Sequence, residues 1–150
     1  MTESVLLKDQ RDGVLLLTLN RANKKNAINN AMWIELRETL QQARQDDDIR
    51  VLVITGAGVD FSAGVDLSDF GGGGEGHPYE ECARELAAFD KPLIGAARGI
   101  AVGGGATMLF HADIVYVGES LRMRLPFVNL GLVPEFASSY LLQANIGARR

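Results

Sequence analysis

The chain has 150 residues, of which 47% are hydrophobic and 23% charged, a composition typical of one globular domain. Its net charge of −4 at pH 7 comes without a lysine–arginine block, so nucleic acid is not an expected partner. Cys82 is the only cysteine, which excludes an internal disulfide framework and a cysteine-based zinc site and favours a reducing compartment.

The first third of the chain predicts a hairpin followed by an amphipathic helix. Residues 4–8 and 13–19 are apolar runs that predict two strands, joined by a polar turn over 9–13. After the polar loop RANKKNAINN, apolar residues recur at helical spacing on one face: Met32, Trp33, Leu36, Leu40 and Ala43. This helix is expected to end near the three aspartates that follow it.

The rest of the chain alternates between strands and helices. Residues 51–54 form a short apolar run typical of a buried strand, and the glycines over 71–76 indicate a mobile loop. Further elements are predicted as a helix over 79–89, a strand over 93–97, a helix over 104–111, a strand over 113–117 and a helix from Pro134 to Gly147. This alternation is typical of an α/β fold with parallel strands.

Gly103, Gly104 and Gly105 stand at the start of a predicted helix, although each glycine weakens a helix by about 1 kcal/mol. Two interpretations remain open. The glycines allow close packing of the helix against a strand. Alternatively, they expose backbone N–H groups that hold developing negative charge, as half of an oxyanion hole.

Other glycine and serine patterns do not fit common catalytic motifs. Neither Gly56 nor Gly103 begins a dinucleotide fingerprint, and the chain has no Walker lysine. Ser62 lacks the first glycine of a nucleophile elbow, which disfavours a serine hydrolase. His77 and His111 are the only histidines, and His111 is expected to cap a helix C-terminus.

Four segments occur in order along the chain: NRANKKNAINN, DFSAGVDL, KPLIGAARGIAVGGG and ADIVYVGESLRMRLPFVNLGLVPEFASSYLL. In order and spacing they resemble the crotonase, or enoyl-CoA hydratase/isomerase, superfamily. The resemblance implies a spiral of ββα units with mainly parallel sheets, forming one N-terminal core over residues 1–150. Family members continue into further helices that join subunits. We therefore expect this chain to be part of a longer protein, a homotrimer or hexamer when the C-terminal helical part is present.

The resemblance implies an enzyme that binds an acyl-CoA thioester and holds its enolate oxygen with the backbone N–H groups of Ala63 and Gly104. It implies no separate cofactor, because coenzyme A is part of the substrate, and no metal. The residues that it assigns to substrate and CoA binding are Lys24, Lys25, Ala27, Ser62, Gly64, Val65, Asp66, Leu67 and Phe127. The lysines have a second interpretation as solvated loop residues, and Asp66 as the N-cap of the short helix LSDF.

The hydratases of this family carry two glutamates that activate water, and the matching positions here are Thr107 and Phe127. Neither side chain is a base at neutral pH, which disfavours hydration. Glu135 resembles the proton-transferring glutamate of peroxisomal-type Δ3,Δ2-enoyl-CoA isomerases, and apolar neighbours are expected to raise its pKa. The implied reaction moves a double bond from the β,γ to the α,β position of a fatty acyl-CoA.

Three alternatives stay open. The same scaffold supports other acyl-CoA reactions, such as hydration or thioester hydrolysis, and a catalytically silent CoA-binding scaffold is the second alternative. In the third, Glu135 follows Pro134 in the first turn of a helix and only complements the helix dipole. The N-terminal sequence lacks the pattern of a signal peptide, and no apolar run reaches about 18 residues. We expect no membrane partner and a cytoplasmic location.

Overall fold

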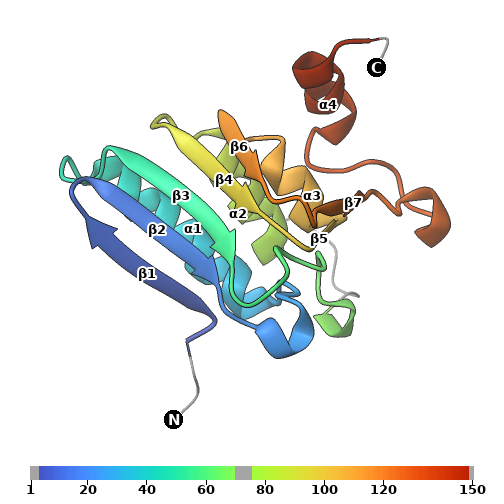
Figure 1. Ribbon diagram of the computed structural model, residues 1–150, viewed down its shortest axis with the longest axis horizontal. Helices are drawn as coiled ribbons and strands as arrows, with labels where there is room; N and C mark the ends of the chain where they lie inside the picture. Colours follow the sequence, from blue (N-terminus) through green and yellow to red (C-terminus); the bar gives the residue numbers. More distant parts are fainter. Residues whose placement is uncertain (1–3, 70–75, 149–150) are drawn as a thin grey trace.

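The computed structural model describes residues 4–69 and 76–148. A twisted five-stranded sheet forms its centre (Figure 1), in the order β1-β2-β3-β4-β6. Its strands are β1 (Leu6–Arg11), β2 (Val14–Leu19), β3 (Val51–Gly56), β4 (Leu93–Ala97) and β6 (Ile114–Val117). The β1–β2 pair is antiparallel and the other three pairs are parallel. The prediction of an α/β fold with mainly parallel strands is confirmed.

The opening hairpin turns more tightly than its sequence predicts. Arg11 pairs with Val14, so only Asp12 and Gly13 form the turn, with φ of 51° and 82°. Positive φ at both positions is typical of the Asp-Gly turn that matches the twist of the strands. β1 therefore continues through charged residues that had indicated a loop, because this edge strand leaves their side chains in solvent.

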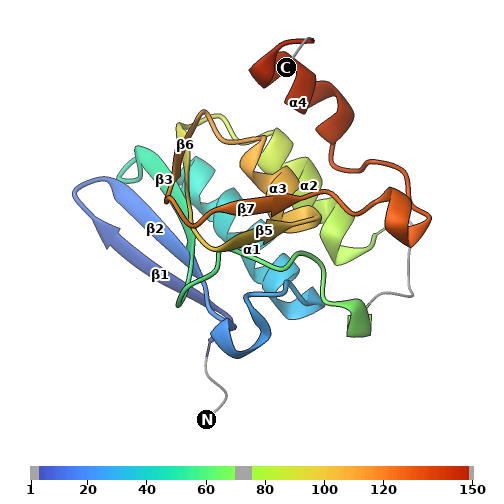
Figure 2. The same ribbon diagram turned by 45° about the vertical axis from the view of Figure 1, so that its right-hand side comes forward.

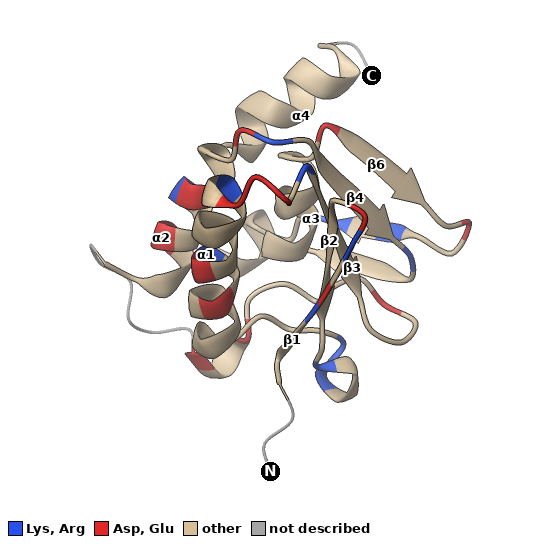
Figure 3. Ribbon diagram, turned by 90° about the vertical axis from the view of Figure 1, so that its left-hand side faces the viewer, with Lys and Arg blue, Asp and Glu red and all other residues tan. Residues whose placement is uncertain are grey.

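Helices α1 (Asn30–Gln45) and α2 (Pro78–Ala87) cover one face of the sheet (Figures 1 and 3). Figure 3 shows several acidic residues along α1 and α2. The Asn29 side chain caps α1 by accepting a hydrogen bond from the Met32 N–H at 3.0 Å. The apolar face predicted for α1 is fully buried: Met32, Trp33, Leu36, Leu40 and Ala43. Burial of each large side chain contributes about 1.5–3 kcal/mol.

A second, two-stranded sheet connects the core to the site. Strands β5 (Ile100–Val102) and β7 (Arg122–Arg124) pair in parallel and lie side by side in Figure 2. The sequence pattern predicted neither strand, because each has only three residues and β7 is charged and exposed. β5 leads directly into α3 (Gly104–Leu109), two residues shorter than expected. The loop predicted at 71–76 falls almost wholly outside the described residues.

The last helix begins later than predicted. α4 covers Ser138–Ile146 and stands apart from the sheet in Figure 1, whereas a start at Pro134 was expected. Phe136 and Ala137 adopt left-handed φ values of 56° and 52°, so the chain between Pro134 and α4 is not helical. His111 Nε2 lies 3.0 Å from the Phe136 carbonyl oxygen, so this side chain holds the irregular segment instead of capping its own helix.

Candidate active site

A cavity of about 340 Å³ lies between three segments: residues 63–67, the start of α3, and residues 124–135. Its volume falls within the range of small-molecule sites. Glu135 is its only acidic lining residue among those described. The predicted site residues that line it are Ala63, Gly64, Val65, Leu67, Gly104, Phe127 and Glu135. Lys24, Lys25, Ala27, Ser62 and Asp66 are not part of this lining.

Gly104 and Gly105, at the start of α3, have different surroundings. A Cβ at Gly105 would lie 2.7 Å from Ser62 Cβ, so this glycine allows close packing. A Cβ at Gly104 would lie 3.4 Å from Val65 Cγ2 and 3.6 Å from Glu135 Oε1, inside the site. The Gly104 N–H, in the first position of α3, has no acceptor among the described residues. The close-packing interpretation therefore applies to Gly105, whereas the free N–H of Gly104 supports the oxyanion interpretation, which enters the proposal below.

The segment FSAGVDL brings a second free N–H close to Gly104. Gly64 has a φ of 89°, and a Cβ on it would lie 3.4 Å from the Gly104 nitrogen. The Ala63 N–H already donates to the Lys25 carbonyl oxygen at 2.9 Å. The Asp66 N–H donates to Ile28, whereas that of Val65 has no acceptor within the described ranges. This hydrogen bonding argues against Ala63 as the second oxyanion donor, and Val65 replaces it in the proposal below.

Asn26 holds this segment in place, a role that no sequence motif indicated. Its fully buried side chain accepts from the Arg21 N–H at 3.0 Å and donates to the carbonyl oxygens of Ala57 and Asp60. Ser62 Oγ donates to the Asn26 carbonyl oxygen at 2.8 Å. Asn26 itself has a φ of 53°, which asparagine adopts more readily than most residues. Buried Ser62 thus has a structural role.

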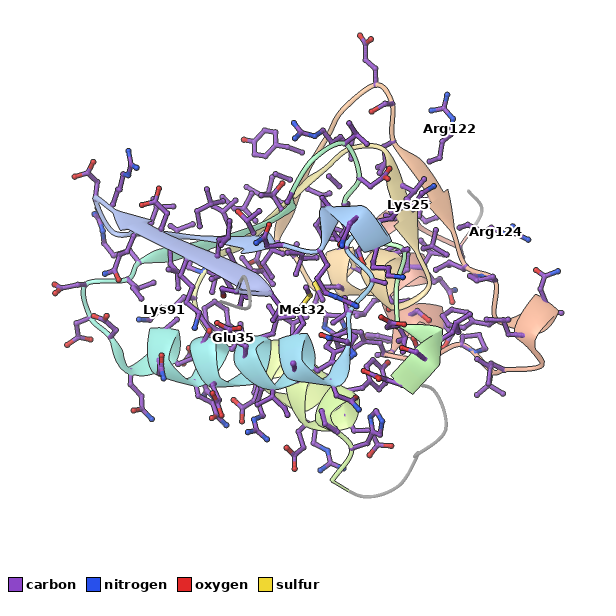
Figure 4. The ribbon with its side chains drawn as sticks, turned by 90° about the horizontal axis from the view of Figure 1, so that it is seen from below. Lys25, Met32, Glu35, Lys91, Arg122 and Arg124 are labelled. Carbon is purple, nitrogen blue, oxygen red and sulfur yellow. The ribbon has the colours of Figure 1, made fainter. Side chains whose placement is uncertain are left out.

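Lys24 and Lys25 are exposed and form no ion pair in the described part of the chain. Figure 4 shows Lys25, Arg122 and Arg124 in the same part of the view, far from Lys91. Arg124 also lines the cavity, which the sequence did not indicate. These cations offer local positive charge on an acidic protein, as a phosphate-bearing ligand requires.

Asp66 organises the loop beside the cavity. Its carboxylate forms an ion pair with Arg21 at 2.8 Å and accepts hydrogen bonds from the Ser68 N–H and hydroxyl, at the start of the short helix Leu67–Asp69. The Arg21 hydrogen bond, followed by those from Ser68, lowers the pKa of Asp66 to about 2. These contacts support its interpretation as a capping residue.

Loss of the Asp66 carboxylate is expected to destabilise the protein in a pH-dependent way. Because the folded-state pKa is depressed, the stabilisation is complete above the usual value of 3.8 and is lost as the pH falls through about 2. Asp66→Asn should therefore unfold at lower urea concentration than the parent at pH 7, and this difference should shrink between pH 4 and 2. Exposed Asp47→Asn is the control, and a difference that is independent of pH would contradict the prediction.

Glu135 is half-buried and lies in the irregular segment before α4, not in the first turn of a helix. The helix-dipole interpretation of this residue is therefore wrong. Burial raises the pKa of Glu135, an effect that the nearby Tyr79 hydroxyl partly offsets. The two positions where hydratases carry glutamates hold buried Phe127 and buried Thr107, whose Oγ1 lies 3.3 Å from the Gly104 carbonyl oxygen. Neither offers a base.

Comparison with known proteins decides the family. Residues 9–150 match the family model described as enoyl-CoA hydratase/isomerase. The chain belongs to this family. A putative enoyl-CoA hydratase/carnithine racemase from Magnetospirillum magneticum superposes on the hydratase/isomerase chain with a TM-score of 0.93 at 39% identity, covering 99% of this chain and 60% of that one. The crotonase fold expected from the resemblance is confirmed.

Curated relatives of this hydratase/isomerase family chain include both reaction types. It is 37% identical to the 2,3-dehydroadipyl-CoA hydratase of Escherichia coli, covering 98% of this chain and 58% of that protein. It is 38% identical to human enoyl-CoA delta isomerase 2, covering 90% of this chain and 36% of that protein. The chain thus spans less than two thirds of the length of these relatives. No helix within the described residues is long and apolar enough to cross a membrane.

Proposed function

We propose that this chain carries the catalytic core of an enoyl-CoA isomerase, which moves a double bond from the β,γ to the α,β position of an unsaturated fatty acyl-CoA. One observation supports this reaction above the others in the family. The only carboxylate among the described lining residues, Glu135, lies beside Gly104, with Oε1 3.6 Å from the position of a Cβ there. A single base next to a free N–H suits proton transfer along an acyl chain.

The proposed reaction is a proton transfer in two steps. The Glu135 carboxylate removes a proton from C2, and the electron pair of that C–H bond moves onto the thioester oxygen. The N–H groups of Gly104 and Val65 donate to this oxygen, and two such donors contribute several kcal/mol. The oxygen then returns its electron pair to re-form the carbonyl, and the C1–C2 pair of the enolate becomes the new C2–C3 double bond. The electron pair of the former C3–C4 double bond takes the proton from the Glu135 carboxyl and forms the C–H bond at C4. No cofactor takes part.

The surroundings of Glu135 support this role. A carboxylate whose pKa is raised is a stronger base, and partial burial supplies that rise here. Phe127 and Leu132 give the cavity an apolar wall suited to an acyl chain. We further propose that Lys24, Lys25 and Arg124 attract the phosphates of coenzyme A. The resemblance also supports a homo-oligomeric, cytoplasmic protein, which sedimentation and fractionation would test.

The test offers the purified protein a β,γ-unsaturated and an α,β-unsaturated acyl-CoA in separate reactions. For an isomerase, we expect the β,γ-unsaturated substrate to be converted to the conjugated thioester, and the ultraviolet absorption of this product measures the conversion. The α,β-unsaturated substrate should give no new product. A 3-hydroxyacyl product from the second substrate would identify a hydratase, and release of free thiol a thioester hydrolase. Binding of both thioesters without any product would identify a silent CoA-binding scaffold.

A further inference from the structure

Tyr79 carries a buried hydroxyl that the fold itself does not explain. The residue lies in the first turn of α2, and its ring packs edge-to-face against Trp33 at 5.2 Å and against Phe136 at 5.8 Å between ring centroids. The hydroxyl has no hydrogen-bond partner of standard geometry among the described residues. A buried hydroxyl without a partner costs about 1–3 kcal/mol, so phenylalanine would be the better choice for packing alone.

Glu135 is the carboxylate next to this ring, because it directly precedes Phe136, whose ring packs against that of Tyr79. After burial, the charge of Glu135 is the largest influence raising the pKa of Tyr79, and the Tyr79 hydroxyl in turn lowers the pKa of Glu135. Glu135 lines the cavity and Tyr79 does not, so Glu135 is the member of this pair that a ligand in the cavity would contact. Hydrogen bonds of catalytic groups often tighten only when substrate is bound.

We propose that Tyr79 is a positioning residue for Glu135, whose hydroxyl donates to the carboxylate and holds it beside Gly104. The inference rests on the proposed isomerase function for its catalytic consequence, but the contact itself does not depend on it. Phe136 keeps the two residues together, because it follows Glu135 in the chain and its ring packs against the Tyr79 ring. The hydroxyl thereby keeps the base ionised and aimed into the cavity.

Other titratable or charged groups near this pair are His111, Cys82, Glu80 and Arg124. His111 stacks on Phe136 at 4.3 Å and hydrogen-bonds its carbonyl oxygen, and burial lowers the pKa of this histidine, which favours the neutral ring. Cys82 and Glu80 lie near Tyr79 and raise its pKa further. Arg124 lines the same cavity as Glu135. Among the described side chains, Tyr79 is the one hydrogen-bond donor that acts on the pKa of Glu135.

The test compares Tyr79→Phe with Tyr140→Phe, a control that removes an exposed hydroxyl. Phenylalanine keeps the ring packing, so both variants are expected to fold. The direct measurement is a carbon-13 NMR titration of protein labelled at glutamate Cδ, with the Glu135 signal assigned by its loss in Glu135→Gln. Tyr79→Phe should raise the pKa of Glu135 by about one unit, because a donor to the charged form is removed. Tyr140→Phe should not move it.

Kinetics provide the second readout. For Tyr79→Phe, the acid limb of the pH profile of kcat/KM for isomerisation should move to higher pH by the same amount as the pKa of Glu135. At pH values below this limb, kcat/KM should therefore fall about tenfold, while KM stays within about twofold of the parent value. If Tyr79→Phe leaves the pKa of Glu135 unchanged, the inference is overturned. It is also overturned if KM rises while the acid limb of kcat/KM stays at the same pH, because the hydroxyl would then contact the substrate and not Glu135. If the parent shows no isomerisation, the proposed function fails, and the titration alone still decides the role of Tyr79.

Discussion

Replacement of Glu135 by glutamine is expected to lower the rate of double-bond migration by about 10²- to 10⁴-fold, the usual contribution of a positioned acid or base. Glutamine fills the same space beside Gly104 but cannot take the proton from C2 or return one to C4. Binding of the acyl-CoA and the urea unfolding midpoint should change little, because glutamine keeps the size and shape of the side chain and its amide oxygen can still accept the hydrogen bond proposed from Tyr79. Steady-state rates and equilibrium binding measure the two effects separately.

The pH dependence of the reaction rate should also identify Glu135 as the base. Burial raises the pKa of Glu135, and the base form exists only above that pKa. The parent rate should therefore fall as the pH decreases through the raised value, and the residual rate of Glu135→Gln should lack this limb. Glu119→Gln, which neutralises an exposed acid, is the matched control. A Glu135→Gln variant with the parent rate would rule out the single-base mechanism.

Gly104→Ala is expected to reduce catalysis by about a hundredfold while the protein stays folded. The added Cβ would lie 3.4, 3.6 and 3.8 Å from Val65, Glu135 and Trp33, which are ordinary van der Waals distances. Alanine also favours the helix by about 1 kcal/mol over glycine. The methyl group nevertheless occupies the space beside the Gly104 N–H that the thioester oxygen would need, and it contacts the base.

Two further glycine variants make this result interpretable. Gly118 does not line the cavity, and an alanine Cβ there would lie 3.2 Å from Arg98 Cβ and 3.8 Å from the Ala97 carbonyl oxygen, so the rate of Gly118→Ala should match the parent. In Gly64→Ala the Cβ would lie 2.4 Å from the Val102 carbonyl oxygen at a φ of 89°, which should lower the free energy of unfolding by about 3 kcal/mol. Urea denaturation and initial rates are measured for all three variants. Parent-like turnover of Gly104→Ala would contradict an oxyanion site at this N–H.

Periodicity predicted the parts of the fold that bury a regular face. The five apolar positions of α1 are buried as their helical spacing predicts. The strand predicted over 51–54 is present as β3, although full burial is limited to alternate residues of it. β5 and β7 have three residues each, which is too short to establish a period. Their pairing depends on contacts between residues 100–102 and 122–124, which local sequence does not encode.

The sequence predicted which segments form the candidate site but not which of their backbone N–H groups are free to bind a ligand. The sequence resemblance placed Gly104 and Glu135 in one site, and the cavity contains both. It could not distinguish the N–H of Ala63 from that of Val65, because the direction of each N–H depends on the left-handed turn at Gly64 and on the Lys25 carbonyl. Tyr79 was not predicted, since it reaches Glu135 only through tertiary packing.

The proposed site combines main-chain hydrogen-bond donors with a side-chain base, and substitutions affect these two parts differently. The two oxyanion donors proposed here belong to the main chain, so side-chain replacement at residue 65 leaves its donor in place unless proline, which has no N–H, is introduced. The proposed proton carrier, Glu135, is a side chain on the short non-helical segment before α4. The His111 side chain hydrogen-bonds the backbone of this segment at Phe136. Under the proposed mechanism, a substitution at position 135 therefore changes the proton-transfer chemistry while both backbone donors stay in place.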